Sequence, residues 1–515
     1  MKNERTKNAM RNMLFGGMLK LYQVIMPFAM RTIIIYTLGS EYAGLTGLFR
    51  SILQVLNLAE LGVGSAMVFS MYRPIANNDT DTICALMRLY KIYYHLIGIV
   101  VAIIGCVITP FLPRLIKSDL PSGVNLYLLY GMNLCASIMS YWLFAYRSSI
   151  LYAHQRTDIS SKVVIITDTI KYIIQIAILL LLKNYYFYIF AILFTQIISS
   201  TWVALLSKKL FPQFEPHGRL EKHEVRELNR RIIDLFTSKL GVVIVGSVDA
   251  IVISAFLGLN SLAVYQNYFY PINAVMGMLT IVYQSCTAGI GNSIITESQE
   301  KNYKDFTRLL FITVWITCFS STCILALIQP FMKLWVGEKL MLPFGIGICL
   351  TVYFFIYEIN ALLNLYKDAA GMWRKDRFRP LFTGIVNLGL NIMLVRCWGL
   401  YGIILSTVFS MLFVGMPWLL KNLFSELFDR EYLGKFLATL LKYTLISLLI
   451  CSFTTYLAHF CSENTIVEML IRLVICIIVS NLLFVIIFHG SDEICYVLFL
   501  ADKVKKNVKR FENER

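Results

Sequence analysis

The feature that most constrains this chain is a series of long apolar segments separated by short polar connections. A helix that spans a membrane needs about 20 mostly apolar residues, and about fourteen segments meet this requirement. They are residues 13–38, 43–70, 87–112, 124–150, 158–182, 185–207, 232–256, 262–289, 305–329, 343–366, 380–395, 399–420, 436–459 and 466–489. The chain is 57% hydrophobic and 15% charged, with a mean hydropathy of +0.66. We therefore predict an all-α integral membrane protein with the lipid bilayer as its surroundings.

Basic residues indicate how these segments are oriented. Cytoplasmic connections of membrane proteins carry an excess of Lys and Arg, and most of the 47 basic residues fall in alternate connections if the amino terminus is cytoplasmic. The external connections then hold only Arg114, Lys117, Lys183, Lys333, Lys339 and Arg396. Both termini are predicted to be cytoplasmic, and the net charge of +16 follows mainly from topology. No soluble basic domain is present, so we predict no nucleic-acid partner.

The sequence contains no pattern that predicts catalysis or metal binding. Its twelve cysteines lie mostly in apolar runs without CxxC or His spacing, and neither GxSxG nor HExxH occurs. The glycine-rich run GVGSA at residues 62–66 lacks the strand and helix of a phosphate-binding loop and suits close helix packing instead. We predict no enzyme, no metal and no cofactor.

Two short sequence similarities predict an internal repeat. Leu38-Gly39, in the connection after the first segment, aligns with Leu257-Gly258, in the connection after the seventh. The residues that lead into segment six are also similar to those that lead into segment twelve. An even number of helices in each repeat makes the repeats parallel. The predicted parts are an N-lobe (1–207), a basic cytoplasmic linker (208–231), a C-lobe (232–421), two further helices (422–490) and a basic tail (491–515).

Charged residues inside the apolar segments indicate a polar interior. Each would cost about 2.5–3.5 kcal/mol at the bilayer centre, so they should face water, protein or one another. Along a helix, Arg50, Gln54 and Asn57 share one face, and Arg31 should lie at a depth similar to that of Arg50. The basic residues are Lys20, Arg31, Arg50, Lys91, Lys171, Lys239, Lys442 and Arg472, and the clearest acids are Glu60, Asp168, Asp249 and Glu358.

Some of these charges have simpler explanations. Lys91, Lys442 and Arg472 lie near segment ends and suit side chains that reach the membrane surface. Asp168 and Lys171, three residues apart, fit a structural ion pair as well as a site. The deeper cations favour an anionic ligand, because guanidinium groups match phosphate oxygens with two parallel hydrogen bonds.

An aromatic and amide-rich stretch begins the eighth segment. Tyr268 and Asn273 belong to the run VYQNYFYPINAVMGM, whose rings and amides suit sugars but equally suit an aromatic belt at the membrane surface. Pro271 in this run is expected to bend the helix.

Several longer stretches resemble one family. The run LGSEYAGLTGLFRSILQVLNLAELGVGSAMVFSMYRPIANND is similar to bacterial polysaccharide flippases of the multidrug/oligosaccharidyl-lipid/polysaccharide exporter superfamily. The runs TAGIGNSIITESQEKNYKDF, PFMKLWVG, RPLFTGIVNLGLNIML and WGLYGIILST carry the same resemblance. It implies two six-helix bundles arranged in a V, as in multidrug and toxic compound extrusion (MATE) transporters, plus two C-terminal helices, in a bacterial cytoplasmic (inner) membrane.

The resemblance also implies a function. Such a flippase moves an undecaprenyl-diphosphate-linked oligosaccharide repeat unit to the external leaflet by alternating access, and polysaccharide polymerases and glycosyltransferases are its expected partners. Arg31, Arg50 and Lys20 would hold the diphosphate. The full predicted cavity set is Lys20, Arg31, Arg50, Lys171, Lys239, Tyr268 and Asn273. Coupling to H⁺ or Na⁺ is expected at an intramembrane carboxylate, with Glu60, Asp249 and Glu358 as the candidates.

The sequence leaves two other functions open as alternatives. A cation-coupled multidrug antiporter of the same superfamily should line its cavity with carboxylates, whereas basic residues outnumber the clear acids here. A membrane-embedded glycan polymerase or ligase should have a large external loop, and no external connection is long enough to bury a core.

Overall fold

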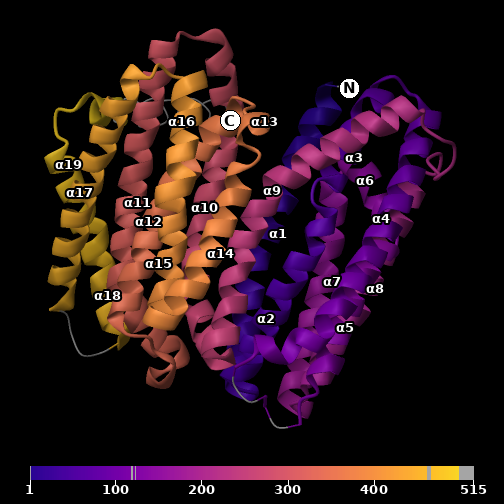
Figure 1. The fold of residues 1–515 in the computed structure, drawn as a ribbon, viewed down its shortest axis with the longest axis horizontal. Coiled ribbons are helices and arrows are strands. Elements are labelled where there is room, and N and C mark those ends of the chain that lie inside the picture. Colours follow the sequence, from indigo (N-terminus) through magenta and orange to yellow (C-terminus); the bar gives the residue numbers. More distant parts are fainter. Residues whose placement is uncertain (1, 118–119, 122, 461–464, 498–515) are drawn as a thin grey trace, which may run out of the picture. The chain divides into compact units, whose positions relative to one another are not determined.

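The computed structural model describes residues 2–117, 120–121, 123–460 and 465–497. In these ranges the chain forms helices and connections, without a strand, as the sequence predicted. The helices group into two compact units (Figure 1). Unit 1 contains residues 1–266 and 380–399, and unit 2 contains residues 267–379 and 400–515.

Unit 1 is built mainly from the first half of the chain. Its most extensive packing joins the pairs α1 with α7, α7 with α8, α5 with α8, α2 with α9 and α4 with α5. Its helices are α1 (Lys2–Thr37), α2 (Ser40–Leu56), α3 (Val63–Ala76), α4 (Thr80–Ile108), α5 (Leu126–Trp142), α6 (Ala145–Ala153), α7 (Thr157–Ala177), α8 (Tyr185–Leu210), α9 (Lys222–Leu257) and the start of α10 (Leu259–Thr296), joined by most of α14 (Arg379–Trp398).

The second predicted span, 43–70, is not one helix. α2 ends at Leu56, a 3₁₀ turn occupies Asn57–Glu60, and α3 begins at Val63 after Gly62. Gly62 has a φ of 90°, which a residue with a side chain rarely adopts, and a Cβ there would lie 2.7 Å from the Cβ of Leu235. The glycine-rich run therefore turns and packs the chain, as the sequence indicated.

The number of spans is close to the predicted fourteen. By length and composition, the described residues contain twelve helices able to cross a membrane, or thirteen if the pair α5 and α6, bent by 52°, counts as one span. The shortfall comes from 43–70 and from the bend within 124–150.

Unit 2 has a core rich in aromatic rings. Phe306 stacks on both Phe428 and Phe436, and Trp315 stacks on Phe484. Besides the rest of α10, its helices are α11 (Gln299–Val336), α12 (Phe344–Ala369), α13 (Trp373–Asp376), α15 (Leu400–Ser410), α16 (Met416–Glu426), α17 (Glu431–His459), α18 (Thr465–Ile475) and α19 (Asn481–Ile487). Helices α17 to α19, the predicted last two spans, pack on α11.

The predicted repeat corresponds to two similar corners. Gly39 joins α1 to α2 with φ 114° and ψ 166°, and Gly258 joins α9 to α10 with φ 91° and ψ 172°. The corners meet within unit 1, where the Ser40 hydroxyl donates to Asn260 Oδ1 at 2.7 Å. Only glycine adopts this backbone conformation readily, which explains why the residue recurs.

The contact units divide the chain differently from the predicted lobes. α9 and most of α14 belong to unit 1 by contact, although the sequence assigned 232–421 to a C-lobe. Within the predicted linker 208–231, α8 runs on to Leu210 and α9 begins at Lys222, after a capping box of Glu221 and Glu224. The lobe boundaries stay a prediction, and residues 498–515 of the predicted tail lie outside the described ranges.

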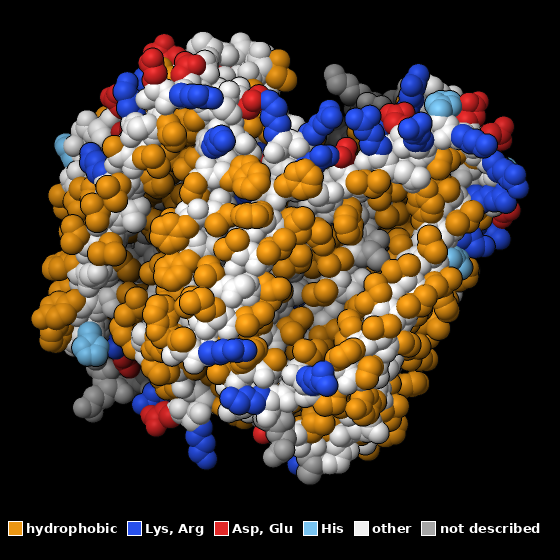
Figure 2. All heavy atoms as spheres, viewed as in Figure 1, with side chains coloured by type: hydrophobic (Ala, Val, Ile, Leu, Met, Phe, Trp, Pro, Cys, Tyr) orange, Lys and Arg blue, Asp and Glu red, His pale blue; other side chains and the backbone are white. Residues whose placement is uncertain are grey.

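The surface fits a membrane. Figure 2 shows hydrophobic side chains over the middle of both units and charged side chains gathered toward the ends. Large apolar side chains are exposed along most spanning helices, for example Ile103 at 59% and Leu449 at 66%. Lipid is the surrounding that such a surface requires.

Candidate functional site

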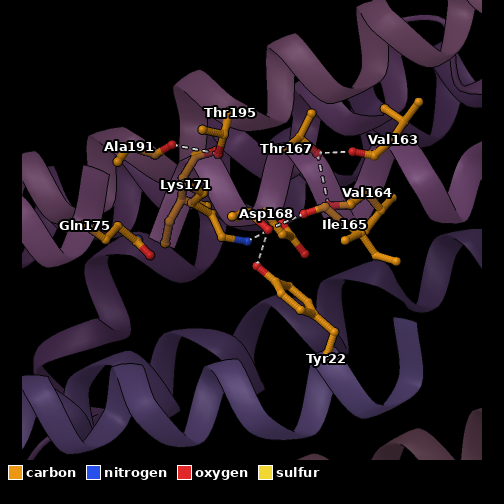
Figure 3. A network of polar contacts seen from close by, with 12 residues as sticks. Tyr22, Val163, Val164, Ile165, Thr167, Asp168, Lys171, Gln175, Ala191 and Thr195 are labelled. Atoms are coloured by element: carbon orange, nitrogen blue, oxygen red, sulfur yellow. Dashed lines mark hydrogen bonds and ion pairs between the residues drawn. The ribbon is translucent and has the colours of Figure 1, made fainter. Parts of the chain in front are cut away.

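The first polar cluster lies between α1 and α7 of unit 1 (Figure 3). The Lys171 ammonium pairs with Asp168 Oδ1 at 2.5 Å, one helical turn apart. The Tyr22 hydroxyl of α1 lies 2.8 Å from the Thr169 hydroxyl of α7. Lys171 and Asp168 are both partly exposed, at 18% and 25%. The ion pair that the sequence left open is therefore present, and solvent or a ligand can reach it.

A second cation, Arg50, lies on the neighbouring helix α2. Its side chain is exposed, and α2 packs on α1, the helix that carries Tyr22. The Lys171 ammonium lies 4.5 Å from the centre of the Tyr172 ring, and the centres of the Tyr22 and Tyr172 rings are 6.1 Å apart. A cation and aromatic faces thus lie together on α1 and α7, and α2 adds the positive charge of Arg50 next to α1. Such a surface attracts anionic groups and offers flat rings for apolar or sugar faces.

Arg31 is held by the start of α10. Its guanidinium donates to the Ala263 carbonyl at 2.8 Å and to Gln266 Oε1 at 3.2 Å. Gly47 of α2 leaves room for that amide, since a Cβ there would lie 2.1 Å from Gln266 Oε1. The guanidinium is partly buried, and these bonds fix its position before any ligand arrives.

The remaining predicted cations of unit 1 are less constrained. Lys20 on α1 and Lys239 on α9 are exposed, and no acidic residue in the described part of the chain pairs with either. That Lys20 and Lys239 line a cavity stays a prediction.

Glu60 lies among tyrosines at the break after α2. Its Oε1 accepts a hydrogen bond of 2.6 Å from Tyr94, whose hydroxyl in turn accepts one of 2.9 Å from Tyr90. The ring of Tyr141 is 5.8 Å from that of Tyr94. Gly64 makes space for these hydroxyls, because its Cβ would lie 3.2 Å from the Tyr90 oxygen. This carboxylate is therefore partnered by neutral donors instead of by a cation.

Asp249 on α9 forms a polar cluster with α14. Asn391 Nδ2 donates to Asp249 Oδ1 at 2.7 Å and approaches Asn387 Oδ1 at 3.3 Å. Both asparagines are fully buried, whereas Asp249 is partly exposed. A carboxylate beside amide oxygens is a ligand set suited to a hard cation or a proton.

Tyr268 and Asn273 lie on the part of α10 that belongs to unit 2. The Tyr268 side chain is fully buried, and its hydroxyl donates to Gln329 Oε1 at 3.0 Å and accepts from the Leu342 amide at 2.9 Å. In this conformation it ties α10 to α11 and the following loop. Asn273 is exposed two residues after Pro271.

Glu358 is fully buried on α12 of unit 2. Its carboxyl lies beside the Tyr283 hydroxyl, yet neither oxygen has a hydrogen bond of ordinary geometry in the described residues. Burying a carboxylate charge without a partner is costly, so this position suits the uptake of a proton or a cation.

Three features of the site were not predicted from the sequence. Tyr22 and Tyr172 were not singled out, and their positions beside Lys171 would have needed the pairing of α1 with α7. Asn387 and Asn391 do carry a sequence signal, since two amides four residues apart lie in an otherwise apolar helix. Among the described residues, no group of three or more His, Cys, Asp or Glu side chains could hold a metal ion.

Comparison with known proteins relates this arrangement to a fold. No family model and no curated protein matches the sequence. The lipid II flippase MurJ, in an inward-closed conformation, superposes with a TM-score of 0.69 at 17% identity, covering 92% of this chain and 99% of MurJ. An inward-facing MATE family multidrug resistance transporter gives a TM-score of 0.59 at 14% identity, over 78% of this chain and 96% of its own.

A third structure is similar over most of its length. It is a transporter of the multidrug/oligosaccharidyl-lipid/polysaccharide exporter superfamily from Pyrococcus furiosus, whose binding pocket is described as having reverse polarity. It superposes with a TM-score of 0.52 at 14% identity, over 81% of this chain and 94% of its own. The chain therefore has the all-helical fold shared by MurJ and the MATE transporters.

Proposed function

We propose that the protein is a transporter of the multidrug/oligosaccharidyl-lipid/polysaccharide exporter superfamily. We further propose that it flips undecaprenyl-diphosphate-linked oligosaccharide repeat units from the cytoplasmic to the external leaflet, in a bacterial inner membrane with both termini cytoplasmic. The observation that carries this proposal is the placement of Lys171 over the ring of Tyr172, which lies beside the ring of Tyr22, with the exposed Arg50 on α2, a helix that packs on α1. The similarity in fold to MurJ supports it.

The chemistry of the substrate explains why these residues are needed. A diphosphate carries several acceptor oxygens, which guanidinium and ammonium groups bind strongly away from bulk water. Sugar rings present apolar faces that pack on tyrosine rings, while their hydroxyls bond amides and hydroxyls. Arg31 and Arg50 would hold the phosphates, with Lys20, Lys171 and Lys239 adding positive potential.

Alternating access needs a step that resets the transporter. The clusters around Asp249 and Glu358 are the best candidates for binding H⁺ or Na⁺, because each places a carboxyl group within a spanning helix, beside the Asn391 amide in one case and beside the Tyr283 hydroxyl in the other. Glu60 is a weaker candidate, since Tyr94 already satisfies one of its oxygens.

Replacing Arg50 is the cleanest test of the proposal. Arg31 also supports the packing of α10, whereas Arg50 is exposed, so Arg50→Ala should leave the protein inserted and folded. We expect export of surface polysaccharide, or translocation of a fluorescent lipid-linked glycan in proteoliposomes, to fall at least tenfold. Lys442→Ala is the matched control, because Lys442 is an exposed intramembrane cation on α17 of unit 2. Equal translocation by Arg50→Ala and wild type would refute the site.

A second function is favoured by one observation. Asp249 with Asn391 and Asn387, together with the MATE-like fold, would suit a cation-coupled multidrug antiporter. Such a protein should accelerate ethidium efflux from cells in a manner that Asp249→Asn abolishes and Arg50→Ala does not. A flippase for diphosphate-linked glycans should give the reverse dependence on Arg50 and no ethidium efflux.

A further inference from the structure

A second cluster of cations lies at the predicted cytoplasmic end of unit 1, apart from the candidate site. It surrounds Asp158, whose side chain is completely buried at the start of α7. Arg156 Nε bonds Asp158 Oδ1 at 3.0 Å, while Arg11 Nε and Lys162 Nζ lie 3.9 and 3.8 Å from Oδ2. The Asp158 backbone amide donates to Asn12 Oδ1 at 2.9 Å, which fixes α1 to α7.

The same sequence pattern occurs once more in unit 2. Arg156-Thr157-Asp158 has a counterpart in Arg374-Lys375-Asp376, in the connection before α14. Asp376 is also buried, at 2%, and accepts bonds of 2.7 and 2.8 Å from Arg379. The two connections therefore use one buried carboxylate each to fasten the helix that follows.

The two clusters differ in charge. Asp376 is surrounded by Arg379 and Lys367, and Lys367 also pairs with Asp368, so two cations meet two carboxylates. Around Asp158, Arg11 lies near the one carboxylate, which Arg156 and Lys162 alone already outnumber. The side chains of these three are 34%, 25% and 43% exposed, so a ligand can reach all of them. Fastening α1 to α7 does not need more positive charge than Asp158 neutralises, and Arg156 and Lys162 already exceed that amount.

Apolar side chains continue from the cluster along both helices. On α1, Leu14 and Met18 follow Arg11 on the same helical face and are 59% and 50% exposed. On α7, Ile166 and Ile170 follow Lys162 at four-residue intervals and are 44% and 41% exposed. The Lys162 ammonium also lies 4.2 Å from the centre of the Phe15 ring on α1. A positively charged end thus leads into two adjacent apolar faces.

We propose that this cluster is a binding site for a phospholipid with an anionic headgroup. Arg11, Arg156 and Lys162 bind the headgroup phosphates, and the faces of α1 and α7 contact the acyl chains. Basic groups at the cytoplasmic end of spanning helices attract anionic lipids, each contributing a similar increment. The site is distinct from the Arg50 and Lys171 cluster and does not depend on the transported substrate.

Lipid titration of the purified protein tests this inference. In detergent micelles, phosphatidylglycerol should raise the thermal unfolding midpoint more than phosphatidylcholine does at the same concentration, and the titration gives an apparent affinity. Removing one cation should weaken that affinity about fivefold, so the double variant Arg11→Gln with Lys162→Gln should lose about 30-fold. Lys162→Arg keeps the charge and should bind as the wild type does.

Unit 2 supplies the control. Lys375→Gln removes an exposed cation from the matched connection, where Lys375 pairs with Glu426, and should leave the phosphatidylglycerol affinity unchanged. Unchanged affinity in the double variant would overturn the proposal, as would equal stabilisation by phosphatidylcholine. Inorganic phosphate that reproduced the full shift at the same concentration would show a site for the free ion and not for a lipid. A lower unfolding midpoint of the double variant without lipid does not affect this comparison, because affinity is read from the shift.

Discussion

Gly44 makes one of the closest backbone approaches in unit 1. A Cβ added to this residue of α2 would lie 2.1 Å from the carbonyl oxygen of Leu259, the first residue of α10. Ordinary contacts begin at 3.4 Å, and a backbone oxygen cannot rotate away as a flexible side chain can. Gly44→Ala must therefore move the helices apart by about 1 Å, and overpacking of this kind costs about 1–3 kcal/mol.

The displacement should also reach the site. Leu259 lies one turn before Ala263, whose carbonyl accepts the hydrogen bond from Arg31. Moving the start of α10 should lengthen that bond and lower transport beyond what lost stability explains. The unfolding free energy would be measured by denaturant titration in detergent, and transport in proteoliposomes at matched protein content.

Gly131→Ala is the matched control for this substitution. Gly131 lies inside α5, and nothing lies within 4 Å of the Cβ that it would gain. Alanine there should be neutral or stabilise by about 0.5–1 kcal/mol, because glycine weakens a helix interior. If both variants had wild-type stability, the close approach of α2 to α10 would be refuted.

Two further predictions follow from individual hydrogen bonds. Tyr94→Phe removes the hydrogen-bond donor to Glu60 and should destabilise the fold by about 1–3 kcal/mol, toward the lower end because Glu60 is only partly buried. Tyr93→Phe is the control and should cost less, because the bond that it loses to Asn229 is exposed. Equal losses of stability in thermal unfolding would contradict this prediction. At the start of α4, the hydroxyl and amide of Thr82 hold the pKa of Asp79 below its usual 3.8. Because the folded pKa is the lower one, the charge on Asp79 stabilises the fold above pH 3.8, and this contribution is lost as the pH falls through the folded value. Asp79→Asn keeps a capping side chain but should remove that part of the pH dependence, and an unchanged slope of the unfolding midpoint between pH 5 and pH 3 would be evidence against it.

Local patterns in the sequence predicted the features that depend on neighbouring residues. The apolar segments gave the all-helical membrane fold, and the Leu-Gly pairs at residues 38–39 and 257–258 identified two corners with the same backbone conformation. The ion pair of Lys171 with Asp168 followed from their spacing. Each of these depends on residues that are close in sequence or on a repeated pattern.

Features that depend on distant partners could not be predicted in this way. Glu60 was expected within the continuous helix 43–70, but its oxygen accepts a hydrogen bond from Tyr94 on α4, and the helix is broken between Leu56 and Val63. Asp249 meets Asn391, 142 residues later, and no sequence pattern relates the two. Helical periodicity reports which face a residue is on, but not which helix will cover that face.

The interleaved division of the chain has a consequence for biosynthesis. Unit 1 needs residues 380–399, which follow the whole first stretch of unit 2, residues 267–379, in the order of synthesis. Asp249 is therefore inserted into the membrane before Asn391 has been synthesised. Because Asn391 lies 142 residues later in the chain, its amide can pack against the Asp249 carboxyl group only after the segment between them has been translated. The order of translation thus leaves unit 1 incomplete until α14 has been inserted, so truncation of the chain anywhere before residue 380 should leave both units unfinished.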